Sequence, residues 1–429
     1  MNEMDAEHDD AGLAPWWTGA ETFHISALQI VPGENGKFNW DTLAQSKNSF
    51  TTHCPIDRGF FERCHALGVR CFPYVLFHAG PAEVSFGPVT STTYQGVDFG
   101  NHPEFYELDS KHQQRQWTGI THDGVGMNFS QPPSLVCPNV QAYQDKMVAW
   151  VDYIMGLGAD GVFIDVIHKR CHCYATHPHI IPEDLGDVAQ NKAYALLLKR
   201  VREMVKQHRP DGLVLGNSGD PLNFSPGSLP EFQEYLDADM FEAYICGPGR
   251  TSHYSDNSIY PTWAEVGRLA QPYLAAGRQI LVISIIDNKD PSTGNQDLSK
   301  DRDDAFFCYA NARVAGFVWF RGSLGKGADD LSLLRLGRPV TGELADPSGV
   351  LFRVFERGLV AVNWDSNDKT LTVRPPIPGT IFYDIYQPLS INLQIIDVST
   401  TGGVLTIPAA SGRVYLFGSD TDYGLNRLT

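Results

Sequence analysis

Acidic side chains stand at the ends of three apolar runs in the middle of the chain. Asp165 ends the run Gly-Val-Phe-Ile-Asp, Glu242 ends Met-Phe-Glu, and Asp287 directly follows a run of Ile, Leu, Val and Ser. A carboxylate at such a place costs free energy unless it has a partner or a chemical role. We therefore take Asp165, Glu242 and Asp287 as the candidate catalytic residues.

Each of these acids has a structural alternative. Asp165 could cap a loop or pair with Lys169 or Arg170. Glu242 could be a buried acid paired with an arginine, and Asp287 could cap the loop that follows its strand.

Two or three carboxylates that converge on one site are the apparatus of glycoside hydrolysis. One protonates the leaving oxygen, and the other is a nucleophile at about 5–5.5 Å separation or activates water at about 6.5–9.5 Å. Repulsion between neighbouring carboxylates splits their pKa values, which assigns the two roles. Asp237 and Asp239 precede a predicted strand instead of following it, so we interpret them as solvated or turn residues.

A sugar site also needs hydroxyl partners and flat apolar surfaces. The residues predicted to contact substrate follow or end the predicted strands, and they are His78, His168, Asn217, Asp220, Tyr244 and Trp319. A core position is an equal alternative for His78, and a turn is an equal alternative for Asn217 and Asp220. Most aromatic residues of any chain lie in the core, which is the alternative for Tyr244 and Trp319.

The stretch from His168 to His179 contains four histidines and two cysteines, residue types that bind zinc. However, Cys171 and Cys173 are only two residues apart, and no second cysteine pair follows. We therefore predict no metal and no cofactor, and we interpret the stretch as a loop beside the active site, with His168 or His172 contacting substrate. A structural zinc site in this stretch is the alternative. A metal-dependent hydrolase that combines this stretch with Asp165 is the first alternative function.

The elements that must position these residues alternate along the central part of the chain. Apolar strand candidates are separated by amphipathic helix candidates, which favours a (β/α)₈ barrel or a doubly wound sheet. The barrel is preferred because no GxGxxG or GxxxxGK[ST] fingerprint is present, and because polar residues follow successive strands. The strands are predicted at 23–31, 70–77, 161–166, 213–216, 240–244, 279–286 and 316–320. Between the second and the third of these, the barrel needs one more strand, for which 105–108 is the one poor candidate.

The boundaries follow from composition. Residues 1–16 form an acidic tail predicted to be disordered, and residues 17–336 form the α/β TIM barrel. Within the barrel, residues 79–136 are rich in Gly, Pro, His and aromatics, which indicates a substrate-shaping insertion. Residues 337–429 contain short strands separated by turn residues, which predicts a C-terminal antiparallel β-sandwich domain.

The net charge and the length of the apolar runs argue against several classes of binding partner. With 33 Lys and Arg against 50 Asp and Glu, the net charge of −17 argues against nucleic acid and anionic membranes as partners. The longest apolar run, 280–286, is far shorter than a membrane span. No signal peptide is visible and the eight cysteines are scattered, so we expect a cytoplasmic protein with free thiols, a removed leader being the alternative. The oligomeric state stays open.

The segments Val136-Cys-Pro-Asn and Gly158-Ala-Asp-Gly-Val-Phe-Ile-Asp165 resemble a segment of (β/α)₈ glycoside hydrolases, the assemblage around α-amylases and α-galactosidases. The resemblance implies that Asp165, at the end of strand four, is the nucleophile. It further implies that Glu242 is the acid/base and that Asp287 orients or stabilises. The sequence departs from the pattern at Phe163, where amylases have Arg, and at Glu242, where α-galactosidases usually have Asp.

The resulting hypothesis is a retaining glycoside hydrolase that acts on an oligo- or polysaccharide. An inverting or transglycosylating enzyme would use the same residues. The second alternative is a non-catalytic carbohydrate-binding barrel in which Asp165 only hydrogen-bonds a sugar.

Overall fold

A computed structural model describes most of the chain between Phe50 and Phe417. The predicted tail 1–16 and the predicted strand 23–31 lie outside the described residues. The residues that the structure describes are 50–52, 54–77, 93–94, 97–115, 134–167, 169–181, 186–219, 230–241, 245–247, 250–251, 270, 273–286, 288, 292–295, 297–322, 331, 336–337, 339–373, 381–386, 394–397 and 403–417.

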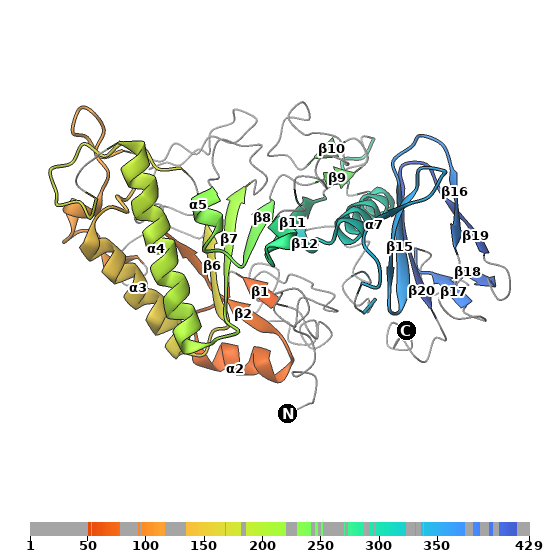
Figure 1. The fold of residues 1–429 in the computed structure, drawn as a ribbon, viewed down its shortest axis with the longest axis horizontal. Helices are drawn as coiled ribbons and strands as arrows, with labels where there is room; N and C mark the ends of the chain where they lie inside the picture. The colour runs from red at the N-terminus through yellow and green to blue at the C-terminus, as the bar shows by residue number, and fades with distance from the viewer. Residues whose placement is uncertain are drawn as a thin grey trace.

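A parallel β-sheet forms the centre of the first part of the protein (Figure 1). Its strands are neighbours in chain order, as repeated βα units require. They are β3 (Tyr74–Leu76), β6 (Gly161–Asp165), β7 (Leu213–Gly219), β8 (Ala238–Phe241), β11 (Gln279–Ile285) and β12 (Val318–Gly322).

One more parallel pair extends this order. The strand β1 (Phe50–Thr52) pairs with β2 (Arg70–Phe72), and Pro73 separates β2 from β3. Strand β1 was not predicted, because three residues are too few to show a periodicity. Within the described residues no ladder joins β12 back to β1, so the strands form an α/β sheet that is open at this point.

The two faces of the sheet bury different clusters. Every parallel strand except β3 contributes a fully buried residue to one apolar cluster, and Tyr74 of β3 packs against it. These residues therefore lie on one face of the sheet, which we call the inner face. The members are Phe50, Phe72, Phe163, Leu213, Leu215, Ala238, Met240, Leu281 and Val318.

Helices cover the outer face. They are α2 (Arg58–Ala66), α3 (Gln141–Gly156), α4 (Asp187–His208), the short α5 (Pro230–Gln233) and α7 (Leu298–Ala315). Asp57 caps α2 by accepting a hydrogen bond from the Phe60 amide, and Asp297 caps α7 in the same way through Lys300. Apolar stripes on α3 and α4 pack with the outward residues of β6 and β7. None of the described helices is long and apolar enough to cross a membrane.

The described part of the predicted insertion packs into the same core. It includes β4 (Thr93–Tyr94), β5 (Val97–Asp98) and the 3₁₀ turn Pro103–Phe105. Val97, Phe99 and Phe105 are buried in the cluster that α3 and α4 share. The short antiparallel pair β9 (Ile245–Gly247) and β10 (Arg250–Thr251) follows β8.

Antiparallel sheets make up the C-terminal part. A six-stranded sheet faces the pair β16 (Lys369–Val373) and β19 (Gly403–Ile407), and apolar residues from both sheets share one cluster. The six strands are β13 (Leu344–Ala345), β14 (Leu351–Phe355), β15 (Gly358–Asn363), β20 (Ser411–Phe417), β17 (Ile381–Asp384) and β18 (Gln394–Asp397).

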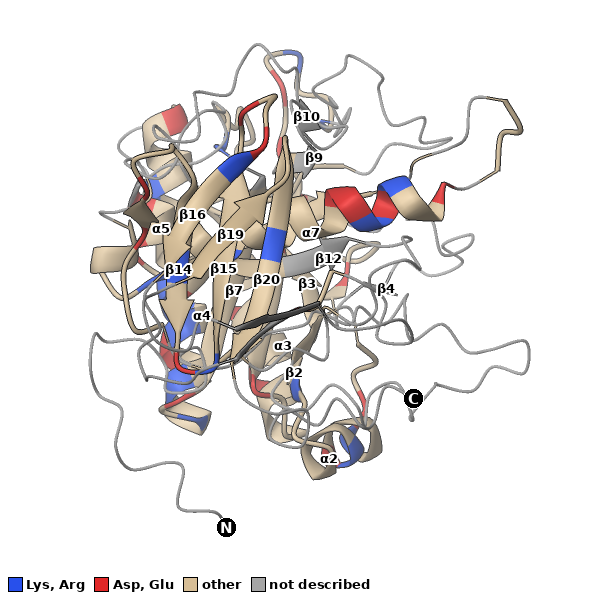
Figure 2. Cartoon of the chain, turned by 90° about the vertical axis from the view of Figure 1, so that its right-hand side faces the viewer, with Lys and Arg blue, Asp and Glu red and all other residues tan. Residues whose placement is uncertain are grey.

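Helix α7 joins the two parts. Most of its charged residues lie in the first turns (Figure 2). From Ala305 onward its side chains are buried, Arg313 included. Phe306 and Phe307 lie in a cluster that also contains Val360, Val414 and residues of β11 and β12. The helix therefore packs the antiparallel sheet onto the parallel one.

This contact leaves no room at Gly412 of β20. A Cβ atom there would meet the carbonyl oxygen of Phe306 and lie 2.7 Å from the Cβ of Ala310. We expect Gly412→Ala to lower the free energy of unfolding by about 1–3 kcal/mol, because the sheet must move away from α7. The measurement is urea denaturation, with Gly342→Ala as control, since nothing lies within 4 Å of a Cβ at Gly342. Equal stability of the two variants would contradict this packing.

Candidate active site

Asp165 lies at the carboxyl end of β6, with both carboxylate oxygens held by neighbouring strands. The Tyr74 hydroxyl on β3 donates a hydrogen bond to Oδ2 at 2.9 Å. The Asn217 side-chain amide on β7 donates to Oδ1 at 2.8 Å. The side chain of Asp165 is half-buried, so its position is fixed while part of it stays accessible to a ligand.

The strand register explains this arrangement. Leu76 pairs with Asp165, and Ile164 pairs with Gly216, so Asn217 lies level with Asp165 on the next strand. Since strand side chains alternate, Asp165 points to the same face as Phe163, which belongs to the inner cluster. Asp165 and Asn217, which follow successive strands in the sequence, thus meet at the carboxyl edge of the sheet. Their roles as nucleophile and substrate contact stay predictions.

The backbone next to Asp165 adopts an unusual conformation. Val166 has a φ of +54°, which is rare for a β-branched residue. The amide of Ile167 donates to the carbonyl of Asn217 at 2.8 Å and holds the chain in this turn. Strained backbone of this kind concentrates at functional sites, where the surrounding structure enforces it.

Trp319 occupies a core position instead of a substrate-facing one. Its side chain is 2% exposed, and its indole nitrogen donates to the Ser284 hydroxyl at 3.2 Å. Its ring lies edge-on against Tyr309 of α7. Because Val318 belongs to the inner cluster, alternation places Trp319 on the helix-facing side, where it offers no platform to a sugar.

The remaining predicted site residues lie outside the described residues. They are His78, His168, Asp220, Glu242, Tyr244 and Asp287. Their roles stay predictions from the sequence.

Asp239 is a buried acid that the sequence analysis misplaced. It lies within β8, is fully buried, and accepts hydrogen bonds from the Ser218 amide, the Ser218 hydroxyl and the Met240 amide. Asp237 precedes β8 in a bend, as predicted, but its carboxylate is held by protein donors: Arg202 donates to it at 2.6 Å and the Val214 amide at 2.9 Å. Strand β8 begins two residues earlier than predicted, which accounts for the error at Asp239.

Burial raises the pKa of Asp239 to about 6 from an ordinary value of 3.8. The folded protein thus binds this proton more tightly than the unfolded chain, so the stability contribution is complete below about pH 4 and is lost as the pH rises through 6. The loss amounts to about 3 kcal/mol. We expect Asp239→Asn to become more stable relative to the wild type as the pH rises from about 4 to about 7.

Urea denaturation at both pH values measures this change. Asn keeps one oxygen as acceptor for the two backbone amides, so the fold should tolerate it. The control is Asp211→Asn, an acid with 45% side-chain exposure. A difference between Asp239→Asn and the wild type that does not vary with pH would contradict the assignment.

A buried ion pair connects the loop that follows β6 to the segment that contains Glu107. Arg170 donates to Glu107 at 2.8 Å, and both side chains are 1% exposed. The Arg170 guanidinium also lies 5.6 Å from the ring centre of Tyr194 on α4. Burial raises the pKa of the Glu107 carboxyl, and the Arg170 charge opposes that shift. The predicted alternative of an Asp165 pair with Arg170 is thus replaced by a Glu107 pair.

Four potential metal ligands that were not predicted as a group come together in this region. They are Cys137, Cys173, His177 and His179. Cys171 is exposed, and His172 stacks on Tyr174 with ring centres 4.1 Å apart. The cluster escaped prediction because Cys137 lies in a different segment, before α3.

Comparison with known proteins gives a likeness in structure alone. No protein family and no curated protein sequence matches the chain. The α-amylase of Geobacillus thermoleovorans, solved with acarbose, superposes with a TM-score of 0.54 at 10% identity, over 94% of this chain and 99% of that one. An Anoxybacillus α-amylase gives 0.51 at 10%, over 94% and 98%. The acarbose-soaked debranching enzyme of Nostoc punctiforme gives 0.51 at 12%, over 94% and 98%.

This likeness defines the fold class. The chain has the α/β fold of the amylase-type (β/α)₈ glycoside hydrolases, which confirms the resemblance indicated by the sequence. At 10–12% identity the likeness reaches the fold and not the activity.

Proposed function

We propose that this protein is a retaining glycoside hydrolase that cleaves an oligo- or polysaccharide. The single observation that carries the proposal is the position of Asp165, whose two oxygens are held by Tyr74 and Asn217 at the carboxyl end of a central strand. Sites of (β/α)₈ enzymes are built at this end of the strands. The fold shared with amylases and debranching enzymes supports the same class.

The proposed architecture completes the described sheet. With the predicted strand 23–31 as the first, β1 is the second, β2 and β3 together are the third, and β6 is the fourth. This count gives eight strands in a closed barrel and places Asp165 at the end of strand four, as the resemblance implies. The C-terminal sheets form a β-sandwich beside the barrel.

In the proposed mechanism Asp165 attacks the anomeric carbon and forms a covalent glycosyl-enzyme. Glu242 protonates the leaving oxygen and then takes a proton from the water that releases the sugar. The hydrogen bonds from Tyr74 and Asn217 orient the attacking carboxylate. Asp287 orients the substrate.

The alternation of side chains along a strand supports the assignment of Glu242 and Asp287 to the same site as Asp165. Met240 and Leu281 point into the inner cluster, and Glu242 and Asp287 stand an even number of residues after them. In a continued strand, residues separated by an even number share a face. The proposal therefore assigns both acids to the face that Asp165 occupies.

The test is reducing-end release from a panel of α- and β-linked oligosaccharides and polysaccharides. The proposal expects release from at least one glycan, with the first-formed product keeping the anomeric configuration of the substrate. Inverted product would change the mechanism and keep the class. Binding of a glycan without release would replace the proposal with the carbohydrate-binding alternative.

A further inference from the structure

Two cysteines and two histidines form a compact cluster beside the loop that follows β6. One sulfur or nitrogen atom from each of Cys137, Cys173, His177 and His179 lies within 4.8 Å of all the others. The Cys173 Sγ and His177 Nε2 atoms are 3.8 Å apart. With Zn–S bonds of about 2.3 Å and Zn–N bonds of about 2.0–2.1 Å, tetrahedral ligand atoms lie about 3.3–3.8 Å apart. The cluster is thus close to the size of a zinc coordination shell.

One buried nitrogen atom of the cluster lacks a hydrogen-bond partner among the described residues. It is the Nε2 atom of His179. A buried polar nitrogen without a partner costs free energy, and a metal bond removes that cost. The His177 and His179 rings lie with centres 4.4 Å apart, so both imidazoles face the same small volume. Cys137 and Cys173 are fully buried beside them.

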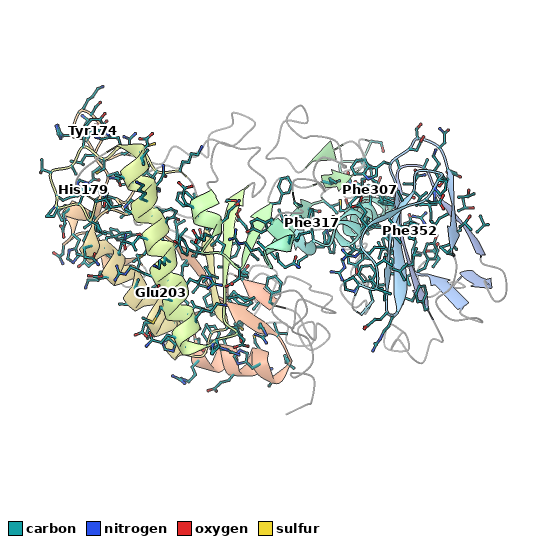
Figure 3. The ribbon with its side chains drawn as sticks, in the orientation of Figure 1. Tyr174, His179, Glu203, Phe307, Phe317 and Phe352 are labelled. Atoms are coloured by element: carbon teal, nitrogen blue, oxygen red, sulfur yellow. The ribbon has the colours of Figure 1, made fainter. Side chains whose placement is uncertain are left out.

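Hydrogen bonds outside the cluster hold the ligands in place. The Cys137 amide donates to the Phe105 carbonyl at 2.7 Å. Asn139 binds the residues that follow His179: its side-chain oxygen accepts from the Ile181 amide at 2.9 Å, and its side-chain nitrogen donates to the Ile181 carbonyl at 3.2 Å. Supporting contacts of this kind orient the ligands of metal sites. Figure 3 shows His179 and Tyr174 near the end of α4 that Asp187 begins.

A second group of potential ligands lacks these properties. His65, Cys71 and Asp160 also lie within ligand distance of one another. The Asp160 carboxylate, however, already accepts hydrogen bonds from His65, from the Cys71 amide and from Arg209. Its oxygens are therefore satisfied by protein donors, and the neighbouring guanidinium disfavours a cation there.

We propose that Cys137, Cys173, His177 and His179 bind a structural zinc ion. Two thiolates and two imidazoles form a closed tetrahedral set without an open position for water or substrate, which distinguishes a structural site from a catalytic one. Two thiolates also balance the charge of Zn²⁺, so the filled site adds no net charge to the interior. Asp165 does not belong to this group of ligand atoms.

The ion would join two segments that lie far apart in the chain. Cys137 precedes α3, and the other three ligands follow β6. The same loop contains Arg170, whose guanidinium donates to the Val136 carbonyl next to Cys137. Zinc would therefore fix the loop that leaves Asp165. This inference does not rest on the proposed glycosidase activity.

The experiment measures metal in the full-length protein, purified under reducing conditions without chelator. Elemental analysis should find about one zinc per chain, and Cys173→Ser and His179→Ala should lose most of it. Matched controls from the same loop, Cys171→Ser and His172→Gln, should keep it, because neither side chain belongs to the cluster. Removal of zinc by a chelator should lower the Tm, and added zinc should restore it.

Cobalt substitution in the wild-type chain covers the case in which a ligand variant does not fold. The cobalt protein should show the absorption bands of a tetrahedral site with thiolate ligands. Three results would overturn the proposal: no zinc or cobalt bound after reconstitution, a Cys137–Cys173 disulfide that persists in the protein purified with reductant, or equal loss of zinc in Cys171→Ser.

Discussion

Replacement of Asp165 by Asn is expected to lower the rate of glycosidic bond cleavage by roughly 10⁴-fold or more, which is the scale for loss of a catalytic group. The amide is nearly the same size as the carboxylate, so the fold should persist. Its oxygen still accepts the hydrogen bond from Asn217, and the Tyr74 hydroxyl can turn to accept from the new amide nitrogen. An amide oxygen does not form the glycosyl-enzyme, so the attacking step is lost. Initial rates on the best glycan of the panel measure the change.

The control for this variant is Asp211→Asn. Asp211 precedes β7, at the opposite end of the strands from Asp165, and forms a surface ion pair with Arg70 at 2.9 Å. Its replacement should leave the rate within about twofold, because exposed pairs contribute little. Activity of Asp165→Asn close to that of the wild type would remove Asp165 from the role of nucleophile.

A second readout separates the nucleophile from a residue that only binds sugar. In Asp165→Ala, added azide can enter the vacated space and attack the anomeric carbon directly. A retaining enzyme then forms a glycosyl azide of inverted configuration, because one displacement replaces two. Weaker glycan binding without any azide product would instead support a binding role for Asp165.

The sequence predicts those residues of the candidate site whose positions depend on the residue pattern of a single strand. The buried run that ends in Asp165 specifies a strand, and its length places the carboxylate at the strand end. Asn217 follows from the same reasoning one strand further along. These two predictions needed only the direction of parallel strands, which brings their carboxyl ends to one edge.

The sequence did not predict on which face of its strand a side chain lies. Trp319 and Asp239 both lie within strands, but both point away from the inner cluster. A shift of one residue in register moves a side chain to the opposite face, and continuous apolar runs do not reveal the register. The sequence therefore indicated the strands near these residues without indicating which residues face inward.

Contacts between distant segments were beyond sequence reasoning altogether. Cys137 lies beside His177 and His179 only because the tertiary fold brings their segments together, and the same holds for the ion pair of Glu107 with Arg170. Spacing rules for zinc sites assume ligands in close pairs, and here one cysteine stands alone before α3. A pair of histidines separated by Pro178, together with a buried cysteine on the same loop, was the local signal available.

Replacement of Glu107 by Ala is expected to lower the free energy of unfolding by about 3–5 kcal/mol, the cost of breaking a buried ion pair on one side. The variant leaves the Arg170 guanidinium 1% exposed without its carboxylate. Arg115 cannot replace the carboxylate, because it is another cation and lies at 3.7 Å from Glu107. Urea denaturation near pH 7, followed by circular dichroism, measures the loss.

The matched control is Glu104→Ala in the same segment. Glu104 is 45% exposed and pairs with His102 at the surface, so its removal should cost less than about 0.5 kcal/mol. The double variant Glu107→Leu with Arg170→Met removes both charges and should recover most of the stability lost in Glu107→Ala. A double variant that is less stable than Glu107→Ala would show that Arg170 acts through its contacts with Val136 and Tyr194 instead of through the ion pair.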